Sequence, residues 1–378
     1  MHIYDYIIIG SGLTGLTIAK KIHQETENIL VLEAQDFAGG SNRAVQINGQ
    51  TINNGLRYYP DTELAEKSAF FLENVLNTKI VGEPIANHPE YYEAHGFKAF
   101  VGFGDHPPAF YDQLSYFLSQ KELPFTTQPY DWMQILQNDL QNKILSKSIV
   151  TKFVFENLES GTPALTHVLV NGSKDIYARN FIYAGPLKEI SHLLPDDVLN
   201  LRAKAKLKKS KAWQAVCLDL FHTVKVEKEN LFILNGTTDD DIGPCVGRFH
   251  SAPDGQISQW ISFIESEVAE DTEAIGHVLK KMKRQIKRAF PEMADSITKE
   301  RIFVTPILSG SDVKLTASNT IPKVPNLWIA SPQASASVNL LGSLQQAQLV
   351  LAALGFGTGI ETVTDVPQYD DEDAESDF

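Results

Sequence analysis

The sequence predicts an α/β fold: a Rossmann-like nucleotide-binding domain, built of a parallel sheet with helices and a β-meander, that carries an inserted α+β domain. Three observations support this prediction. The apolar run Tyr6–Ile9 leads through "GSGLTG" into a segment of helical period. A second apolar run, Ile29–Leu32, follows and ends at Glu33. Near the end of the chain "NLWIASPQ" precedes a further helical pattern, which completes a strand-and-helix repertoire typical of buried parallel sheets.

The glycine-rich turn has the spacing G-x-G-x-x-G, with glycines at positions 10, 12 and 15. The first glycine permits a tight turn, the second lets the backbone approach a pyrophosphate, and the third lets the helix pack close to the strand. The helix N-terminus also offers free N–H groups to phosphates. Glu33, at the end of the second strand, can accept hydrogen bonds from both ribose hydroxyls and would repel a 2′-phosphate. The motif therefore predicts an adenine dinucleotide site, for NAD or FAD rather than NADP.

Composition excludes several classes of protein. The 378 residues carry a formal net charge of −14, which argues against a nucleic-acid partner. Cys217 and Cys245 form neither a CxxC pair nor a disulfide framework, which is typical of a reducing compartment. No apolar run is long enough to cross a membrane, and the N-terminus lacks the features of a secretion signal. We expect a cytoplasmic protein without an integral membrane segment.

The remaining elements follow from periodicity and turn residues. Apolar spacing predicts helices over Thr62–Asn77, Ala274–Phe290 and about Gly342–Leu354. Three strand-like runs occupy residues 144–182, and Asn171-Gly172 between two of them signals a hairpin. The segment from Tyr91 to Pro129, rich in aromatics, glycine and proline, predicts irregular structure. The basic run Arg202–Lys211 indicates a solvated helix or strand face, with an anionic ligand or the acidic tail as the alternative, and residues 365–378 are predicted to be a disordered acidic tail.

Downstream of Glu33, "AQDFAGGSNRAVQINGQTINNGLRYYP" resembles the FAD-dependent family of amine oxidases, phytoene desaturases and protoporphyrinogen oxidases, with some likeness to UDP-galactopyranose mutases. That family has a Gly-Gly pair and a nearby arginine here, matched by Gly39, Gly40 and Arg43. It then has an acid-x-Gly-x-His/Arg-aromatic segment near the flavin, matched by "NNGLRYYP" with Asn54 in place of the acid. The resemblance continues through "SIVTKF", "ARNFIYAGP" and the C-terminal strand and helix, and it implies FAD as the cofactor.

The resemblance also implies a set of site residues and a domain plan. The implied cofactor-binding residues are Gly10, Gly12, Leu13, Thr14, Gly15, Glu33, Ala34, Gly39, Gly40, Ser41, Asn42, Arg43, Asn54, Gly55, Leu56, Arg57, Val150, Ala184, Gly185, Pro186, Ser331, Leu341, Gly342 and Ser343. The FAD-binding domain would comprise residues 1–60, 130–195 and 300–360, and the substrate domain residues 61–129 and 196–299. Two departures from the family pattern are Ala330-Ser331-Pro332, where Ala-Gly-acid is usual, and Gln346-Ala347-Gln348, where a Ser-Gly pair is usual.

The implied chemistry is oxidation or desaturation of a small organic substrate at a C–N or C–C bond, with hydride transfer to flavin N5 and with oxygen as a possible electron acceptor. Catalytic residues stay unknown; Arg57, Tyr58 and Tyr59 are the candidates beside the flavin segment. Lys314, with Trp260 or Trp328, could match the lysine and aromatic cage of amine oxidases.

Other functions stay open from the sequence. One alternative is a mutase-like isomerase, which would hold a sugar-nucleotide diphosphate with Arg57, Arg248 and Arg301. Another is a flavin-bound accessory subunit of a partner enzyme. The histidines at positions 88, 95 and 106 fit no tight zinc spacing, so we expect no metal site. The oligomeric state cannot be read from the residues.

Overall fold

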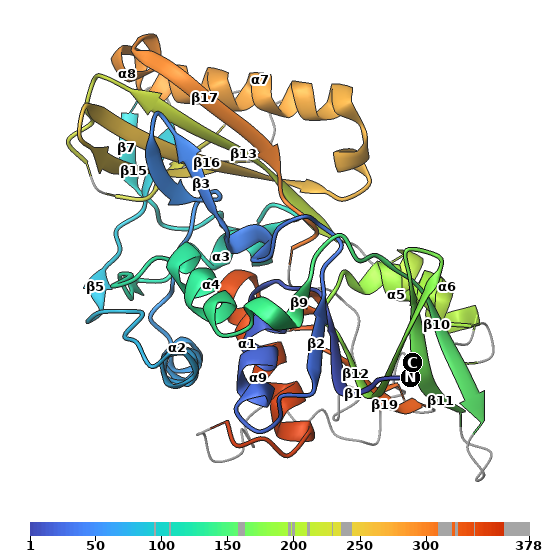
Figure 1. Cartoon of the computed structure of the whole chain (residues 1–378). Coiled ribbons are helices and arrows are strands. Elements are labelled where there is room, and N and C mark those ends of the chain that lie inside the picture. Colours follow the sequence, from blue (N-terminus) through green and yellow to red (C-terminus); the bar gives the residue numbers. More distant parts are fainter. Residues whose placement is uncertain are drawn as a thin grey trace.

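The computed structural model describes residues 1–93, 96–105, 107–157, 163–195, 198, 201–209, 212–228, 230–235, 244–308, 320–321, 324–335 and 337–358. It has a mixed α/β architecture with two large sheets, one in each half of the molecule (Figure 1). The predicted α/β class is confirmed. Lys314 and the tail 365–378 lie outside the described residues.

The first sheet is built around five parallel strands. In spatial order they are β9 (Ile144–Leu145), β2 (Ile29–Leu32), β1 (Ile3–Ile9), β12 (Lys174–Tyr183) and β19 (Val324–Ile329). The short strand β18 (Thr320–Ile321) pairs antiparallel with β19. The apolar runs of β1 and β2 form parallel strands because helices and a meander cover both faces, so that the consecutive side chains of residues 7–9 and 29–32 are all buried.

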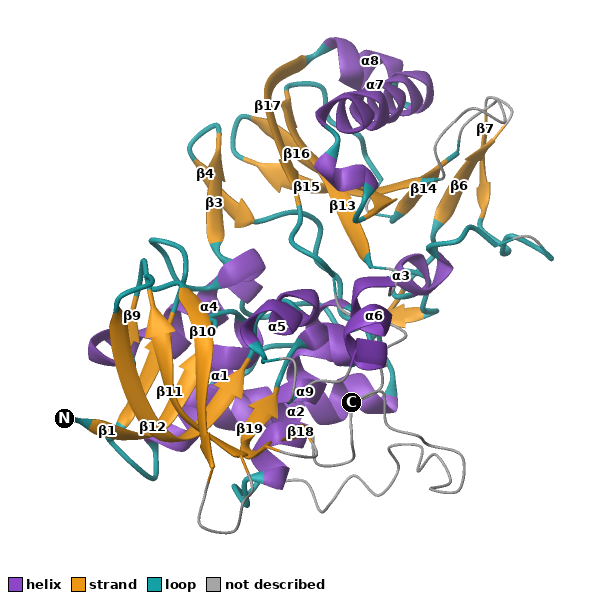
Figure 2. Cartoon of the chain, turned by 90° about the vertical axis from the view of Figure 1, so that its right-hand side faces the viewer, coloured by secondary structure: helices purple, strands orange, loops and turns teal. Residues whose placement is uncertain are grey.

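The meander consists of β10 (Val150–Asn157) and β11 (Pro163–Val170), which continue the sheet antiparallel from β12 (Figure 2). The hairpin predicted at Asn171-Gly172 is confirmed. Both turn residues have positive φ, 51° and 71°, the combination that Asn-Gly adopts in tight hairpin turns.

Helices cover the two faces of this sheet. Ile8, Val31 and Ile182 share an apolar cluster with α1 (Leu13–His23), α2 (Glu63–Leu76), α4 (Pro129–Asn138) and α9 (Asn339–Ala353). The alternate residues Ile7, Leu30 and Phe181 share another with the meander and with α5 (Leu187–Leu193) and α6 (Leu201–Lys209). Most of the basic run 202–211 lies in α6, and a helix was one of the two secondary structures predicted for it.

The second sheet forms the other half of the molecule. Its strand order is β17 (Ile297–Val304), β13 (Trp213–His222), β16 (Gly255–Glu265), β15 (Cys245–Ala252), β14 (Phe232–Leu234), β6 (Glu90–Glu93) and β7 (Gly96–Ala99). On one face, residues such as Val216, Leu218 and Trp260 pack against α7 (Thr272–Ala289) and α8 (Pro291–Asp295). On the other face, Ala215, Cys217 and Phe263 join the apolar cluster of the first half. The two halves therefore share one continuous core.

The remaining elements are short. They are β3 (Ala44–Ile47), β4 (Gln50–Asn53), β5 (Ile85–Ala86), β8 (Lys121–Glu122), α3 (Tyr111–Ser115) and the 3-10 turns η1 (Gly40–Asn42), η2 (Gln141–Lys143), η3 (Val268–Glu270) and η4 (Pro332–Ala334). No helix among the described residues is long and apolar enough to span a membrane.

Three segments differ from the expectations. Within 91–129, β6 and β7 extend the second sheet, because β14 offers a free edge to which β6 pairs in parallel. Strand β17 pairs with β13, so residues 300–304 lie in the second sheet although the predicted boundary fell at residue 300. Helix α2, expected in the substrate domain, packs on α1, α4 and α9. Each difference reflects long-range pairing that local periodicity does not encode.

Candidate functional site

The carboxyl ends of the parallel strands meet at one edge of the first sheet. Gly10 follows β1, Glu33 follows β2, Ala184 follows β12 and Ala330 follows β19. Backbone hydrogen bonds join these positions: the N–H of Gly10 donates to Leu32 at 2.8 Å, that of Ala184 to Ile9 at 2.8 Å, and that of Ala330 to Tyr183 at 2.8 Å. In open α/β sheets this edge is where ligands bind. The structure thus brings together four segments that are widely separated in the sequence.

The three glycines of the turn have three different surroundings. Gly10 has φ +105°, and a Cβ there would lie 3.1 Å from the Ala184 carbonyl oxygen. A Cβ on Gly15 would lie 2.0 Å from the Gly10 oxygen, so the close packing of α1 requires glycine. A Cβ on Gly12 would meet no described atom within 4 Å. The second glycine therefore faces open space, as the approach of a ligand to the backbone requires.

Glu33 is held rigidly beside this turn. Its side chain is buried, and one oxygen accepts from the Ser11 N–H at 3.0 Å and the Ser11 hydroxyl at 2.5 Å. The other oxygen accepts from the N–H of Gln35 at 2.8 Å and retains a further lone pair. The next residue, Ala34, is exposed. Just before Val150, the N–H of Ser148 donates to the Glu33 carbonyl at 2.8 Å, so the start of β10 lies close to Glu33.

The Gly-Gly pair lies directly on the first glycine turn. Gly39 and Gly40 have φ +105° and +55°, and the N–H of Gly39 donates to the Ser11 carbonyl at 2.9 Å. A Cβ on Gly40 would come within 3.1 Å of the Gly12 Cα. Two glycine-rich turns from different parts of the chain therefore stack on each other, where larger side chains would separate them.

The arginine that holds the second turn is Arg57. It donates to the Asn42 side-chain oxygen at 2.9 Å, to the Ser41 carbonyl at 2.5 Å and to the Leu56 carbonyl at 3.2 Å. Burial lowers the pKa of this guanidinium, because desolvation disfavours the charged form. Arg43, which the sequence predicts to bind the cofactor, stacks 3.8 Å over the ring of Phe37.

The segment Asn54-Gly55 lies between the two halves of the molecule. Gly55 has φ +85°, and a Cβ there would come within 2.9 Å of the Phe303 ring and 3.4 Å of the Cys217 sulfur. The Asn54 amide donates to the Ser41 carbonyl at 3.4 Å and accepts from Arg301. The second sheet therefore contacts the predicted flavin segment directly.

Two C-terminal segments, the end of β19 and the start of α9, also lie at the carboxyl edge of the parallel sheet beside the glycine turns. The Thr14 hydroxyl donates to the Ser343 carbonyl at 3.0 Å, which places the first turns of α1 and α9 side by side. Leu341 and Gly342 are buried in the same turn of α9. The Ser331 side chain is fully buried, yet its hydroxyl has no hydrogen-bond partner among the described residues. Beyond β12, Gly185 packs on the ring of Tyr183, whose hydroxyl donates to the Pro186 carbonyl at 2.8 Å.

The two tyrosines after Arg57 are buried in the hydrophobic core. Tyr58 is 2% exposed, and its hydroxyl contacts the Ser119 hydroxyl at 2.6 Å and the Asn87 amide at 2.8 Å. Tyr59 is 1% exposed and donates to the Ala65 carbonyl at 3.2 Å. Burial raises the pKa of Tyr58 to about 12 and that of Tyr59 further. These contacts account for both residues by packing.

The other candidates from the sequence lie away from this edge of the sheet or beyond the described residues. Trp260 is fully buried on the α7 side of the second sheet, which excludes it from an aromatic cage at the site. Trp328 packs within β19 against the cluster of α1 and α9. His88 is exposed, whereas His95 and His106 lie outside the described residues. No group of metal-binding side chains occurs among the residues that the structure describes.

A row of polar residues crosses the second sheet. Its members Gln259 and Asp219 were missed from the sequence, whereas Arg248 and Arg301 were predicted only as diphosphate-holding residues of a mutase-like enzyme. Arg248, Gln259, Asp219 and Arg301 occupy paired positions on β15, β16, β13 and β17 and face the first half. The available signal was Asp219 itself, because it is the single charged residue in the otherwise apolar central run "AVCLDLF". A carboxylate in a buried strand requires a partner, and the partner is supplied by another strand.

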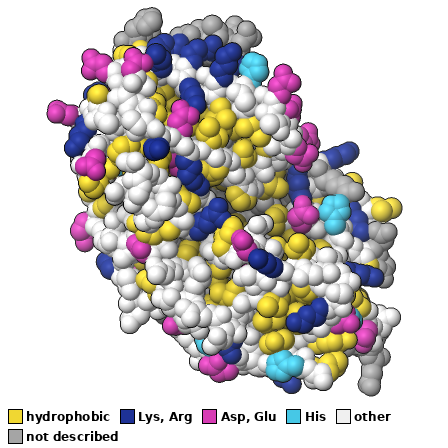
Figure 3. Space-filling model, turned by 45° about the horizontal axis from the view of Figure 1, so that its top comes forward, with side chains coloured by type: hydrophobic (Ala, Val, Ile, Leu, Met, Phe, Trp, Pro, Cys, Tyr) yellow, Lys and Arg dark blue, Asp and Glu magenta, His cyan; other side chains and the backbone are white. Residues whose placement is uncertain are grey.

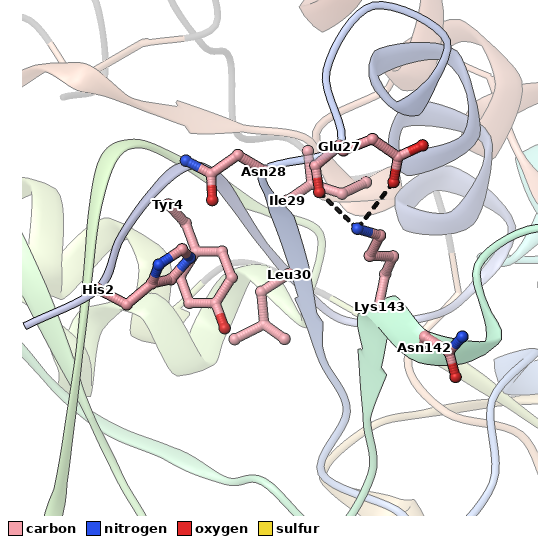
Figure 4. A pocket seen from close by; sticks show the side chains of 8 residues that line it. All are labelled: His2, Tyr4, Glu27, Asn28, Ile29, Leu30, Asn142 and Lys143. Carbon is pink, nitrogen blue, oxygen red and sulfur yellow. Dashed lines mark hydrogen bonds and ion pairs between the residues drawn. The ribbon is translucent and has the colours of Figure 1, made fainter.

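A surface hollow of about 380 Å³ lies elsewhere (Figure 4). It is lined by His2, Tyr4, Glu27, Asn28, Ile29, Leu30, Asn142 and Lys143, and Lys143 forms an ion pair with Glu27 at 2.9 Å. Its residues belong to the amino-terminal ends of β1 and β2 and to η2, which directly precedes β9. This hollow is therefore at the opposite edge of the sheet from the glycine turns.

Charged side chains of both signs are interspersed on the face shown in Figure 3, and hydrophobic side chains gather in its middle.

Comparisons with known proteins agree with this geometry. A family model described as an NAD(P)-binding Rossmann-like domain matches residues 8–72. A segment of 45 residues, 12% of this chain, is 42% identical to flavin-containing amine oxidase A of Equus caballus, and it spans 8% of that protein.

Solved structures share the fold over most of the chain. Putrescine oxidase superposes with a TM-score of 0.65 at 11% identity, covering 93% of this chain and 98% of that one. Cyclohexylamine oxidase from Brevibacterium oxydans gives 0.63 at 13% identity over 93% and 98%. An oxidoreductase from Methanosarcina mazei gives 0.66 at 11% identity over 92% and 100%. The chain has the fold of these oxidases, and its N-terminal part is a Rossmann-like domain.

Proposed function

We propose that this chain, which has the fold of flavin-containing amine oxidases, is an FAD-dependent oxidoreductase that oxidises or desaturates a small organic substrate at a C–N or C–C bond. The observation that supports it most is the stack of two glycine turns at the carboxyl edge of the parallel sheet, where Gly12 faces open space beside the buried carboxylate of Glu33. A dinucleotide needs this combination of backbone access and a ribose acceptor.

The residues present fit FAD. Gly12 and the N-terminus of α1 would receive the pyrophosphate, and the remaining lone pair of Glu33 would accept from the adenosine ribose. The orphaned, fully buried hydroxyl of Ser331 is a donor that a bound cofactor can satisfy. We extend the proposal to the positions that the family resemblance implies, including Val150 for the adenine and Leu341–Ser343 at the N-terminus of α9.

FAD, when bound, supplies a two-electron acceptor for the substrate's C–H bond. The protein's part is to orient the cofactor and to exclude water. Arg57 fixes η1 through Ser41 and Asn42, and Asn54-Gly55 fixes the junction with the second sheet. Helix α9 presents its N-terminal dipole to the carboxyl edge of the parallel sheet, which favours negative charge there.

A mutase-like isomerase fits the arginines less well. Such an enzyme needs guanidinium groups to hold a diphosphate. Arg248 is paired with Glu122 at 2.7 Å, Arg301 with Asp219 at 2.7 Å, and Arg57 donates to three oxygens of the protein. The accessory-subunit alternative shares the predicted FAD binding and differs in having no substrate turnover of its own.

The test begins with purified protein, which should be yellow and should release FAD on denaturation. An anaerobic panel of monoamines, diamines, amino acids and polyenes should then contain a compound that bleaches the flavin. Colourless protein that takes up no FAD would overturn the proposal. Bound FAD that no substrate bleaches, together with binding of UDP-sugars only after chemical reduction, would favour the isomerase instead.

A further inference from the structure

We infer that Asp219 is a positioning residue for the cofactor: through Arg301 and Asn54 it fixes the Gly39–Asn42 turn that lies against Gly12. This inference rests on the proposed binding of FAD and adds a role for the second sheet, which contributes none of the residues implied to bind the cofactor. Asp219 would affect the affinity for the cofactor and would make no contact with the substrate.

The register of the second sheet aligns the participants. Asp219 is the cross-strand partner of Gln259 on one side and of Arg301 on the other, and Gln259 is the partner of Arg248. Cross-strand neighbours on one face lie about 5 Å apart, within reach of direct hydrogen bonds. The four side chains therefore form one polar row across the face that meets the first half.

Asp219 is the centre of this row. Its side chain is fully buried; one oxygen accepts from Arg301 at 2.7 Å and the other from Gln259 at 3.0 Å. Burial raises the pKa of this carboxyl, while the two donors oppose that shift. A buried carboxylate with one donor on each oxygen holds both donors in fixed orientations.

The first branch runs from Arg301 to the glycine turn. Arg301 donates to Asp219 with one terminal nitrogen and to the side-chain oxygen of Asn54 with the other. The amide nitrogen of Asn54 then donates to the Ser41 carbonyl at 3.4 Å, within the turn that Arg57 also grips. The Asn54 amide can both accept from Arg301 and donate to Ser41, whereas an ionised carboxylate can only accept. This dual role gives a physical reason for asparagine where an acid is usual.

The second branch runs from Gln259. Its amide nitrogen donates to Asp219 and, at 3.0 Å, to the carbonyl of Asn53. The Asn53 side chain donates at 2.8 Å to Gln128, the N-cap residue of α4. Helix α4 in turn packs Met133 about 3.4 Å from where a Gly39 Cβ would lie. Both branches therefore end at the same turn.

The experiment compares FAD binding by the apoproteins of the wild type, Asp219→Asn and Asn54→Asp. Asp219→Asn leaves Arg301 without its carboxylate. Asn54→Asp keeps Asp219 and an acceptor for Arg301, replaces the donor to Ser41 with an oxygen atom and adds one negative charge. We expect each to raise the FAD dissociation constant about tenfold or more, the scale of one charge-assisted hydrogen bond, and to shift the visible absorption band of bound flavin.

Glu300→Gln is the matched control. Glu300 precedes Arg301 on β17 and pairs with Lys283 at 2.5 Å on the opposite face, so this variant should bind FAD as the wild type does. Circular dichroism and thermal unfolding of each apoprotein establish folding. If Asp219→Asn does not fold, Asn54→Asp decides the question. Folded variants with the wild-type dissociation constant and spectrum would overturn the inference, whereas wild-type apoprotein that takes up no FAD would overturn the proposed function and the inference with it.

Discussion

At the residue scale, Gly12 and Gly15 are three positions apart, yet a side chain added at Gly12 would enter open space, whereas one added at Gly15 would clash with the backbone. Gly12 has φ −73° and ψ −176°, an extended conformation that any residue adopts, and its Cβ would point into open space. At Gly15 a Cβ would collide with the backbone of Gly10. The first glycine of this pair is thus explained by a ligand and the second by the fold.

Gly12→Val should therefore fold normally and lose FAD, because its isopropyl group would occupy the pyrophosphate approach. Gly15→Ala should instead lower the stability of the apoprotein, because α1 must move away from the turn. Flavin content and thermal unfolding measure the two effects separately. Full flavin occupancy in Gly12→Val would refute the pyrophosphate assignment.

Glu33→Ala should weaken both the fold and the cofactor site. It removes the acceptor of three hydrogen bonds, donated by the Ser11 N–H, the Ser11 hydroxyl and the Gln35 N–H. We expect a loss of about 1–3 kcal/mol in the free energy of unfolding of the apoprotein, the cost of leaving such donors unpaired. Urea denaturation measures this loss, and FAD titration should show weaker binding in parallel. An unchanged urea midpoint would contradict it.

At the element scale, capping residues and turn residues account for where the helices begin and end. Helix α2 begins after Thr62, whose hydroxyl accepts from the Ala65 N–H at 3.2 Å, and ends at Asn77 with φ +52°. Helix α4 begins with a capping box between Gln128 and Asp131. These signals are local, which is why the predicted helix over 62–77 is confirmed almost to the residue.

Thr62→Ala should reduce the free energy of unfolding by about 0.5–2 kcal/mol through loss of that cap. Glu63→Gln, at the exposed first position of the same helix, is the control, and it should change stability by less than about 0.5 kcal/mol. Equal losses in the two variants, measured by urea denaturation, would show that the cap contributes nothing.

At the scale of the whole molecule, we expect buried tyrosines in the core shared by the two halves to make the free energy of unfolding fall at alkaline pH. Tyr58 lies in this core with Tyr116, whose hydroxyl donates to the Tyr58 carbonyl at 2.5 Å. Burial raises the pKa of Tyr58 to about 12 and raises that of Tyr116 strongly, whereas an unfolded tyrosine titrates near about 10. The unfolded state therefore releases these protons first, so stability is complete below pH of about 10 and falls as the pH rises toward 12.

Tyr58→Phe should make this alkaline decline shallower. The variant loses the hydrogen bonds to Ser119 and Asn87, so it should be less stable at neutral pH by roughly 1 kcal/mol. Its free energy of unfolding should nevertheless depend less on pH between about 9 and 11 than that of the wild type. Identical slopes in the two proteins would contradict the assignment of Tyr58 to the alkaline transition.

The sequence by itself determined the features that depend on near neighbours. The buried strands, the G-x-G-x-x-G turn, the acid at Glu33 and the Asn171-Gly172 hairpin follow from residues within one turn or strand, and the structure has each of them. The Rossmann-like domain was predictable for the same reason.

Only the tertiary structure decided which distant segments meet. It places Gly40 against Gly12, and it pairs β17 and β6 with the second sheet. It also shows that Arg57 donates a hydrogen bond to η1, whereas Arg43 stacks on the ring of Phe37. It also places Asp219 between Arg301 and Gln259. The physical reason is that a buried charge or a free strand edge specifies that a partner is needed, whereas the path of the chain through space specifies which residue supplies it.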